Sequence, residues 1–384
     1  MRNFTAICLA IVTTAMLGFS SAVTPAHAGN EPYVIGAVFD VTGTGSPLGA
    51  PEEATVRMLE KQINAKGGIN GHPLKVIYCD NASDEAKSVT AMKKLIESDK
   101  VLAIIGTSQT GTTLSGEATV EAAGIPMISC GSGVKIVQPV KKWIFKTAQS
   151  DVHAVAKVLD YLQTKRLSKI AVISVANAYG DSGKQQLEKQ APGAGIKIVE
   201  EESFGSADTD MTAQLMKIRR SDAQAVICWG TNPGPAIVTK NMRALGIKLP
   251  LIQSHGVANT KFIELAGVAA EGVIFPAGKI IVANEIPHSD KQRSVLLGYT
   301  SAYKKEYSRE ADTFGGHAYD AMMLIEQALK TAGADRAKIR MALESARLVG
   351  ISGVFKFTPA DHNGLAKDAF TMVKIVNGKW TLDR

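Results

Sequence analysis

Cysteine is scarce in this sequence, with four residues among 384. Cys8 lies in an apolar N-terminal stretch, which leaves Cys79, Cys130 and Cys228 scattered along the rest of the chain. An odd, widely spaced set excludes a disulfide-rich scaffold, and we expect these three side chains to be buried as small hydrophobic groups. No histidine of the chain stands two to four residues from another histidine or a cysteine, so the spacing typical of a zinc site is missing as well.

Dense blocks of one charge are also missing. The formal net charge is +7 at pH 7, and the basic residues are spread along the chain. Nucleic-acid binding requires clustered positive charge, so we expect no nucleic-acid partner. A mild positive balance favours small anionic ligands, although only weakly.

Long hydrophobic runs are confined to the N-terminus. Arg2 precedes the apolar run Ala6–Phe19, and Ala26-His27-Ala28 supplies the small residues around a signal-peptidase cleavage site. The run is too short to span a bilayer comfortably. We therefore expect residues 1–28 to be a cleavable signal peptide that exports the protein to the periplasm.

Each candidate motif for catalysis or cofactor binding lacks part of the required pattern or context. Gly43–Gly49 has one residue too many for a dinucleotide-binding G-x-G-x-x-G loop. Gly180-Asp181-Ser182-Gly183 spells the surroundings of a protease nucleophile, but it starts a helix rather than lying in a β-barrel. Cys130 has no base nearby in the sequence. We predict no catalytic residue, no metal and no cofactor.

Strand-like and helical segments alternate along most of the chain. The pattern begins at Tyr33–Val38 and Glu52–Asn64, and it restarts at Val152–Thr164 and Lys169–Val175. Such repetition predicts parallel sheets covered by helices on both faces. The expected fold is α/β, with two doubly wound Rossmann-like lobes joined by a multi-strand hinge.

The last third of the chain contains too few strands for an independent domain. Three helical patterns come together at 290–346, and two short β-like runs follow at 354–357 and 370–376. We expect this part to complete both lobes. Lobe one then comprises residues 29–148 and 279–355, and lobe two comprises residues 149–278 and 356–384.

The segments that follow the predicted strands are rich in Gly, Ser, Thr and Asn and poor in charge. In open α/β sheets, ligands bind beyond the carboxyl ends of the strands. A small ligand held by hydrogen bonds fits these loops, with a carboxylate received by backbone N–H groups. The principal loops are Thr107–Thr113, Ser129–Gly133, Ala176–Gly180, Gly230–Gly234 and Gln253–Asn259.

Several short motifs stand in the order and spacing of one known family. They are Ile35-Gly36-Ala37, Ile63–Gly71, Ala103–Gly106, Gly124–Ser129, Ala178-Tyr179-Gly180, Gly256–Asn259 and Ala318–Ala321. Together they span residues 33–378, and the chain resembles the type I periplasmic solute-binding proteins of ABC transporters, in particular the branched-chain amino-acid group. The resemblance implies a non-catalytic monomer that delivers a small carboxylate to an inner-membrane ABC permease.

The resemblance also implies binding residues. Thr110 matches the hydroxyl residue that holds the ligand carboxylate in the family. Gly131 and Gly133, with Ser132 between them, match the loop that offers backbone N–H groups to the ligand's head group. Tyr179 matches the aromatic residue that covers the ligand when the lobes close.

Two departures from the family leave the ligand open. His255 stands where the amino-acid binders have an acidic residue that pairs with the ligand ammonium, and imidazole is no partner for an ammonium. Thr231 replaces the aromatic residue that the family has in the cleft of lobe two. Leu48 lies in the loop of lobe one, at a position where family members can have an aromatic residue. Either Asp40 or Glu52 takes the acidic role for an amino acid, or the ligand is an aromatic or other apolar acid without an ammonium. A ligand sensor and an enzyme are less favoured alternatives.

Overall fold

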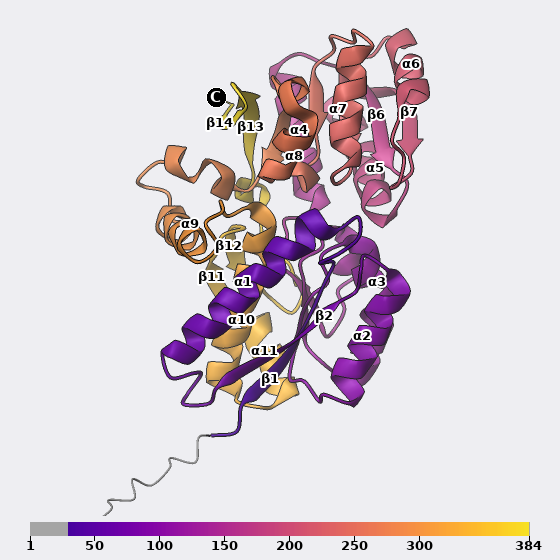
Figure 1. Ribbon diagram of the computed structural model, residues 1–384. Helices are drawn as coiled ribbons and strands as arrows, with labels where there is room; N and C mark the ends of the chain where they lie inside the picture. Colours follow the sequence, from indigo (N-terminus) through magenta and orange to yellow (C-terminus); the bar gives the residue numbers. More distant parts are fainter. Residues whose placement is uncertain (1–29, 384) are drawn as a thin grey trace, which may run out of the picture.

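The computed structural model describes residues 30–383, and these residues form two lobes (Figure 1). The predicted signal peptide, residues 1–28, lies outside the described residues. The prediction of two α/β lobes is confirmed, because two separate, mainly parallel sheets are present. The chain enters lobe one, and its C-terminus lies in lobe two.

The lobe-one sheet has the strand order β2-β1-β3-β4-β5, and all of its strands are parallel. Four of its strands are mainly apolar runs that are almost completely buried, as in parallel sheets covered on both faces, whereas β2 at the edge is partly exposed. They are β1 (Tyr33–Phe39), β2 (Leu74–Asp80), β3 (Ile104–Gly106), β4 (Met127–Ser129) and β5 (Ile144–Lys146). The short strand β5 has too little pattern to be predicted from the sequence.

Helices from both ends of the chain cover this sheet. In the first part lie α1 (Ser46–Ala65), α2 (Glu85–Glu97) and α3 (Thr110–Ala123), and the last third supplies α9 (Arg293–Tyr307), α10 (Thr313–Ala332) and α11 (Arg336–Glu344). Helices α1 and α10 lie side by side although more than 200 residues separate them (Figure 1). These helices of the last third therefore pack on lobe one.

The lobe-two sheet has the order β14-β13-β10-β9-β8-β6-β7. Strands β6 to β10 are parallel, while β13 and β14 join antiparallel at the edge beyond β10. The strands are β6 (Lys169–Val175), β7 (Lys197–Phe204), β8 (Ala225–Trp229), β9 (Leu251–Gln253), β10 (Ile274–Ala277), β13 (Thr371–Val376) and β14 (Lys379–Leu382). The helices of lobe two are α4 (Asp151–Thr164), α5 (Ala178–Gln190), α6 (Thr212–Arg220), α7 (Gly234–Ala244) and α8 (Thr260–Ala266).

The chain passes between the two sheets three times: after β5, after β10 and before β13. The first and third crossings are tied to each other. Gln149 Nε2 donates to the carbonyl of Ser352 at 2.8 Å, and Asn363 Nδ2 donates to the carbonyls of Lys146 (3.2 Å) and Ala148 (3.0 Å). A small hairpin, β11 (Arg347–Val349) with β12 (Val354–Lys356), precedes the third crossing.

The third crossing also covers the open edge of the lobe-one sheet. The ring of His362 stacks on Phe145 of β5 at 4.0 Å, and Phe357 lies 5.5 Å from the same ring. The N–H of Lys146 donates to the carbonyl of His362 at 3.0 Å. An exposed strand edge invites pairing with other chains, and this segment closes it.

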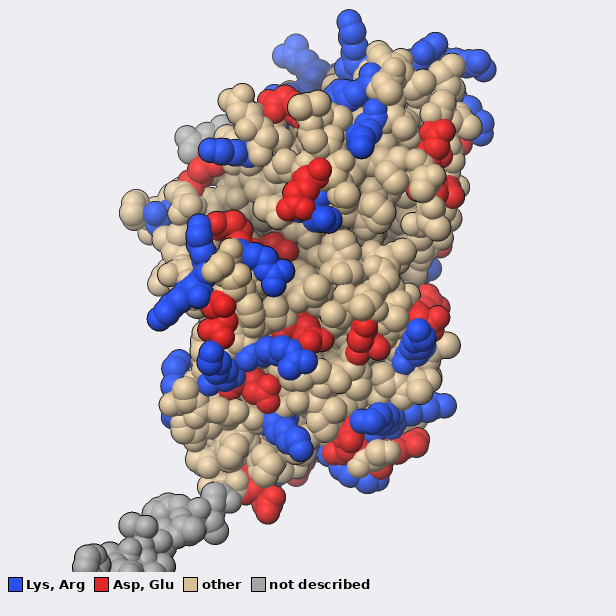
Figure 2. All heavy atoms as spheres, viewed as in Figure 1, with Lys and Arg blue, Asp and Glu red and all other residues tan. Residues whose placement is uncertain are grey.

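Charged side chains are interspersed over most of the face shown in Figure 2, with Lys and Arg standing among Asp and Glu. Several of them form exposed pairs, such as Lys61 with Glu306 at 2.7 Å. Among the described residues, no helix combines the length and apolar character needed to cross a membrane.

Replacing Phe145 by alanine should destabilise the protein by about 3–5 kcal/mol, because the change leaves a cavity between β5 and the third crossing. Urea unfolding measures the difference. The matched control is Val140→Ala, since Val140 is 40% exposed and its truncation should change the free energy of unfolding by less than about 0.5 kcal/mol. Equal stabilities for the two variants would contradict the role given to Phe145.

Candidate functional site in the cleft between the lobes

A cavity lies between the two lobes, at the carboxyl ends of their strands. Both lobes contribute to its wall. Lobe one supplies Leu48, Ser108, Gln109, Thr110, Cys130, Ser132, Phe314 and His317, and lobe two supplies Tyr179, Thr231, His255 and Gly256. The wall is therefore built from hydroxyl groups, an amide, a thiol, aromatic rings and aliphatic side chains, and it includes two histidines.

Most of the residues predicted to bind a ligand come together at this cavity. Six of the eight line it, namely Leu48, Thr110, Ser132, Tyr179, Thr231 and His255. Gly131 and Gly133 flank Ser132 and lie beside the cavity rather than in its wall. The sequence analysis missed Ser108, Gln109, Phe314 and His317. Ser108 and Gln109 could have been found from their place at a strand end, but nothing local marked Phe314 or His317.

The N–H groups of Gly131 and Gly133 are already engaged within the protein. Gly131 donates to the hydroxyl of Ser129 at 2.9 Å, and Gly133 donates to Thr110 Oγ1 at 3.2 Å. A Cβ on Gly133 would lie only 2.4 Å from Cγ2 of Thr110, so close packing of the two loops explains the glycine. The hydroxyl proton of Thr110 remains available, because its oxygen serves as the acceptor in this bond.

A buried lysine supports the same loop from below. Lys146, at the end of β5, donates from Nζ to the carbonyls of Ser132 (2.8 Å) and Ala148 (3.0 Å). Burial lowers the pKa of Lys146 to about 7, against the favourable charge of Asp151. Sequence analysis could not identify this residue, because one lysine at the end of a short apolar run is typical of a solvated strand end.

His255 lies in a cluster of aromatic rings in lobe two. The rings of Tyr179, Trp229 and Phe370 surround it edge-on, with centroids 5.7, 5.9 and 5.3 Å away. Its Nδ1 lies 3.5 Å from the hydroxyl of Tyr179. Burial, followed by the charge of Lys146, lowers the pKa of His255 to about 3, so the imidazole is neutral at physiological pH.

The acidic residues near the site do not line the cavity. Asp40 accepts hydrogen bonds from Asn81 (2.8 Å) and Gln109 (2.7 Å) and is thereby engaged in lobe one. Glu52 is fully buried, neither of its oxygens has a partner among the described residues, and burial raises its pKa well above the usual value. Asp151, at the start of α4, lies 3.7 Å from Nε2 of His255 and is not among the residues of the cavity wall.

Cys130 and Ser182, which the sequence analysis weighed as nucleophiles, have other surroundings. Burial raises the pKa of the Cys130 thiol well above its usual value, which keeps it protonated. Ser182 lies inside α5, as expected for a helix start, and its hydroxyl accepts from the N–H of Val134 at 3.4 Å. Cys130 and Cys228 are buried as predicted, Cys79 is half-buried, and the three thiols are free.

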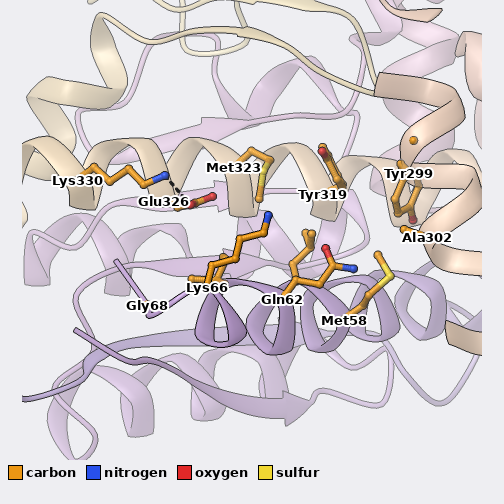
Figure 3. A pocket seen from close by; sticks show the side chains of 13 residues that line it. Met58, Gln62, Lys66, Gly68, Tyr299, Ala302, Tyr319, Met323, Glu326 and Lys330 are labelled. Carbon is orange, nitrogen blue, oxygen red and sulfur yellow. Dashed lines mark hydrogen bonds and ion pairs between the residues drawn. The ribbon is translucent and has the colours of Figure 1, made fainter. Parts of the chain in front are cut away.

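A larger open groove lies on the outer side of lobe one, between α1, α9 and α10 (Figure 3). Met58, Tyr319 and Met323 form part of its apolar floor, and Lys330 pairs with Glu326 at 2.6 Å on its rim. It contains none of the residues predicted to bind a ligand. The cleft between the lobes is therefore the better candidate site.

Direct hydrogen bonds hold the two lobes together around the cavity. Asn259 of lobe two donates from Nδ2 to the carbonyl of Pro47 in α1 at 2.8 Å. Val134 of lobe one donates to Ser182 of lobe two. The lobes are thus closed on each other in this structure.

The chain matches the family model described as "Periplasmic binding protein" over residues 32–379 and belongs to that family. Proteins of this family bind small molecules outside the cytoplasm, and the two lobes with a cleft are the matching architecture. One curated relative is a Leucine-, isoleucine-, valine-, threonine-, and alanine-binding protein of Pseudomonas aeruginosa, which is 25% identical over 79% of this chain and 80% of its own length. Another is Leu/Ile/Val-binding protein homolog 3 of Brucella melitensis, which is 22% identical over 96% of each chain.

Solved structures agree with the assignment. An extracellular ligand-binding receptor from Rhodopseudomonas palustris HaA2 superposes with a TM-score of 0.87 at 27% identity, covering 92% of this chain and 99% of that one. A solute-binding protein of an ABC transporter from R. palustris, solved in complex with benzoate, has a TM-score of 0.80 at 19% identity, covering 92% and 95%, and shares the fold. The chain is a type I periplasmic binding protein, similar to proteins that are named for binding leucine, isoleucine and valine.

Removing the hydrogen bond between Asn259 of lobe two and Pro47 of lobe one should shift the protein toward an open form. In Asn259→Ala, we expect ligand affinity to fall about fivefold, because a typical hydrogen bond contributes about 1 kcal/mol and this one exists only when the lobes are closed. Small-angle scattering should show a larger radius of gyration without ligand.

Asn284→Ala, at an exposed position of lobe one, is the control and should leave both quantities unchanged. An Asn259→Ala protein with unchanged affinity and scattering would show that this bond does not stabilise the closed form.

Proposed function

We propose that this protein is the substrate-binding component of an ABC importer, which takes a small carboxylate into the cleft and delivers it to an inner-membrane permease. Residues 1–28 would direct it to the periplasm. The observation that carries the proposal is the cavity between the lobes, whose wall combines the hydroxyl of Thr110 with apolar and aromatic side chains contributed by both lobes.

The carboxylate would bind at the lobe-one side of the cavity. Thr110 offers its hydroxyl proton there, and the N–H of Ser132 donates to no other group of the described residues. Lys146, whose Nζ donates to the carbonyl of Ser132, adds positive potential next to this loop when it is protonated. Gly131 and Gly133 contribute by letting the loop pack on Thr110, while Tyr179, Thr231 and His255 cover the ligand from lobe two.

The cavity favours an aromatic or other apolar acid without an ammonium group. A buried ammonium that lacks a carboxylate partner costs several kcal/mol. The two histidines of the wall are neutral, and Asp40, Glu52 and Asp151 do not reach the cavity. Leu48 and Phe314 instead provide contacts for an apolar body.

A branched-chain amino acid is the second candidate ligand. It is favoured by the relatives, which are named as leucine-, isoleucine- and valine-binding proteins. For such a ligand to bind, Asp151 or Glu52 would have to turn toward the cavity on binding. The benzoate complex of the R. palustris protein shows that this fold also holds an acid without an ammonium.

Closure of the lobes would couple binding to transport. The ligand contacts lobe two only in the closed form, so it stabilises that form by those additional contacts. Micromolar affinity corresponds to about 8 kcal/mol, which one anchored carboxylate and a buried apolar body can supply.

A binding panel tests the proposal on protein lacking residues 1–28. Thermal shifts are measured with the common amino acids and with benzoates, cinnamates and aliphatic acids. A ligand at about 100 times its dissociation constant should stabilise the fold by about 2.7 kcal/mol. A shift with acids that lack an ammonium supports the first ligand class, and a shift with leucine or valine supports the second. If no carboxylate causes a shift, the proposed function is wrong.

Thr110→Val should weaken the binding of the acid identified by the panel about tenfold, because it removes the donor to the carboxylate while keeping the shape of the side chain. Thr110→Ser keeps a hydroxyl and should lie within about threefold of the wild type. Calorimetric titration measures both.

Thr90→Val, on the exposed face of α2, is the control. An unchanged dissociation constant in Thr110→Val would remove this residue from the site.

A further inference from the structure

His317 lines the cavity and lies at the start of α10, close to the crossings between the lobes. It is 2% exposed, and its ring meets that of Phe314, another residue of the wall, edge-on at 6.0 Å. One ring nitrogen, Nε2, lies 3.1 Å from Oε1 of Gln149. The other, Nδ1, is buried and has no hydrogen-bond partner among residues 30–383.

Hydrogen bonds around Gln149 determine which nitrogen of His317 carries the proton. The amide nitrogen of Gln149 donates to the carbonyl of Ser352 at 2.8 Å, and a carbonyl can only accept. The amide oxygen of Gln149 must therefore accept, and its partner is Nε2 of His317, which is the N–H. In the neutral ring, Nδ1 then presents a lone pair.

Protonation of Nδ1 would remove that lone pair, but the environment of the ring disfavours the protonated form. Burial, followed by the charge of Lys146, lowers the pKa of His317 to about 3. Near neutral pH, Nδ1 is thus a buried acceptor without a donor. A buried acceptor left unsatisfied carries a desolvation cost, so a ligand that supplies a donor gains more than one that does not.

We propose that His317 selects, among small carboxylates, those that also carry a hydroxyl group, with the hydroxyl donating to Nδ1 and the carboxylate held near Thr110. This inference rests on the proposed function and specifies its ligand. The hydroxyl is the donor that fits, because it needs no carboxylate partner and the cavity wall contains none. A carboxylate oxygen facing Nδ1 would be repelled, so the same histidine also fixes which end of the ligand enters lobe one.

Matched ligands that differ in one group test the proposal by calorimetric titration of protein lacking residues 1–28. The set is benzoate, the three hydroxybenzoates and the corresponding methoxybenzoates, with the cinnamate series as longer analogues. At least one hydroxy acid should bind about tenfold more tightly than both its parent acid and its methoxy analogue, because a methoxy group accepts but does not donate. Leucine and 2-hydroxy-4-methylpentanoate form a second pair, in which ammonium and hydroxyl are compared directly.

Variants then assign the preference to His317. In His317→Phe, the hydroxy acid and its parent should bind within about threefold of each other, mainly through weaker binding of the hydroxy acid. His317→Gln can donate to Gln149 and still offer an acceptor, so it should restore much of the preference. His288→Phe, at an exposed position, is the control and should behave as the wild type.

Several results would overturn the proposal. If the wild-type protein binds the parent, hydroxy and methoxy acids equally well, the role given to His317 is wrong, whereas the proposed function of binding a carboxylate is still supported. If His317→Phe still prefers hydroxy acids, another residue causes the preference. If leucine binds and its hydroxy analogue does not, the site selects an ammonium group and not a hydroxyl group. If no acid binds, the proposed function itself fails, and this inference fails with it.

Discussion

The site depends on a set of buried hydrogen bonds that join the first and third crossings between the lobes to helix α10. Gln149 uses its amide oxygen for His317 and its amide nitrogen for Ser352. The carboxylate of Asp320, one turn further along α10, accepts from the N–H of Ser352 at 2.7 Å. Buried polar groups are costly when they lose a partner, so these segments keep one fixed register. That register places His317 in the cavity wall.

The same constraint separates what is rigid from what can move. The sheets and their helices are close-packed apolar layers, whereas the lobes meet through few hydrogen bonds, such as those of Asn259 and Ser182. Polar bonds of this kind exchange with water at small net cost. Opening therefore changes the crossings and the cavity but leaves each lobe intact, and a ligand that contacts both lobes is what shifts the balance.

The sequence predicts the architecture well because parallel strands buried on both faces read as apolar runs, and their carboxyl ends can be located. Thr110, Tyr179 and His255 follow from those strand ends together with the family resemblance. Lys146 and His317 could not be predicted, since each is a single polar residue in an apolar segment whose role arises from distant parts of the chain. The family resemblance also implied that Gly131 and Gly133 offer their N–H groups to a ligand, but in the folded loops these N–H groups bond to Ser129 and Thr110.

Neutral histidines change what the cleft can distinguish. A carboxylate at the position of His255 would select a cation by charge, and the interaction would act in any orientation of the ligand that brings the charges together. An imidazole with a low pKa carries no charge, so it discriminates through the direction of its N–H and its lone pair. Because the tautomer of His317 is determined by Gln149, which belongs to the first crossing, the group that reads the ligand is positioned by the hinge segment. Ligand recognition therefore depends on hydrogen bonds of a segment that also connects the two lobes.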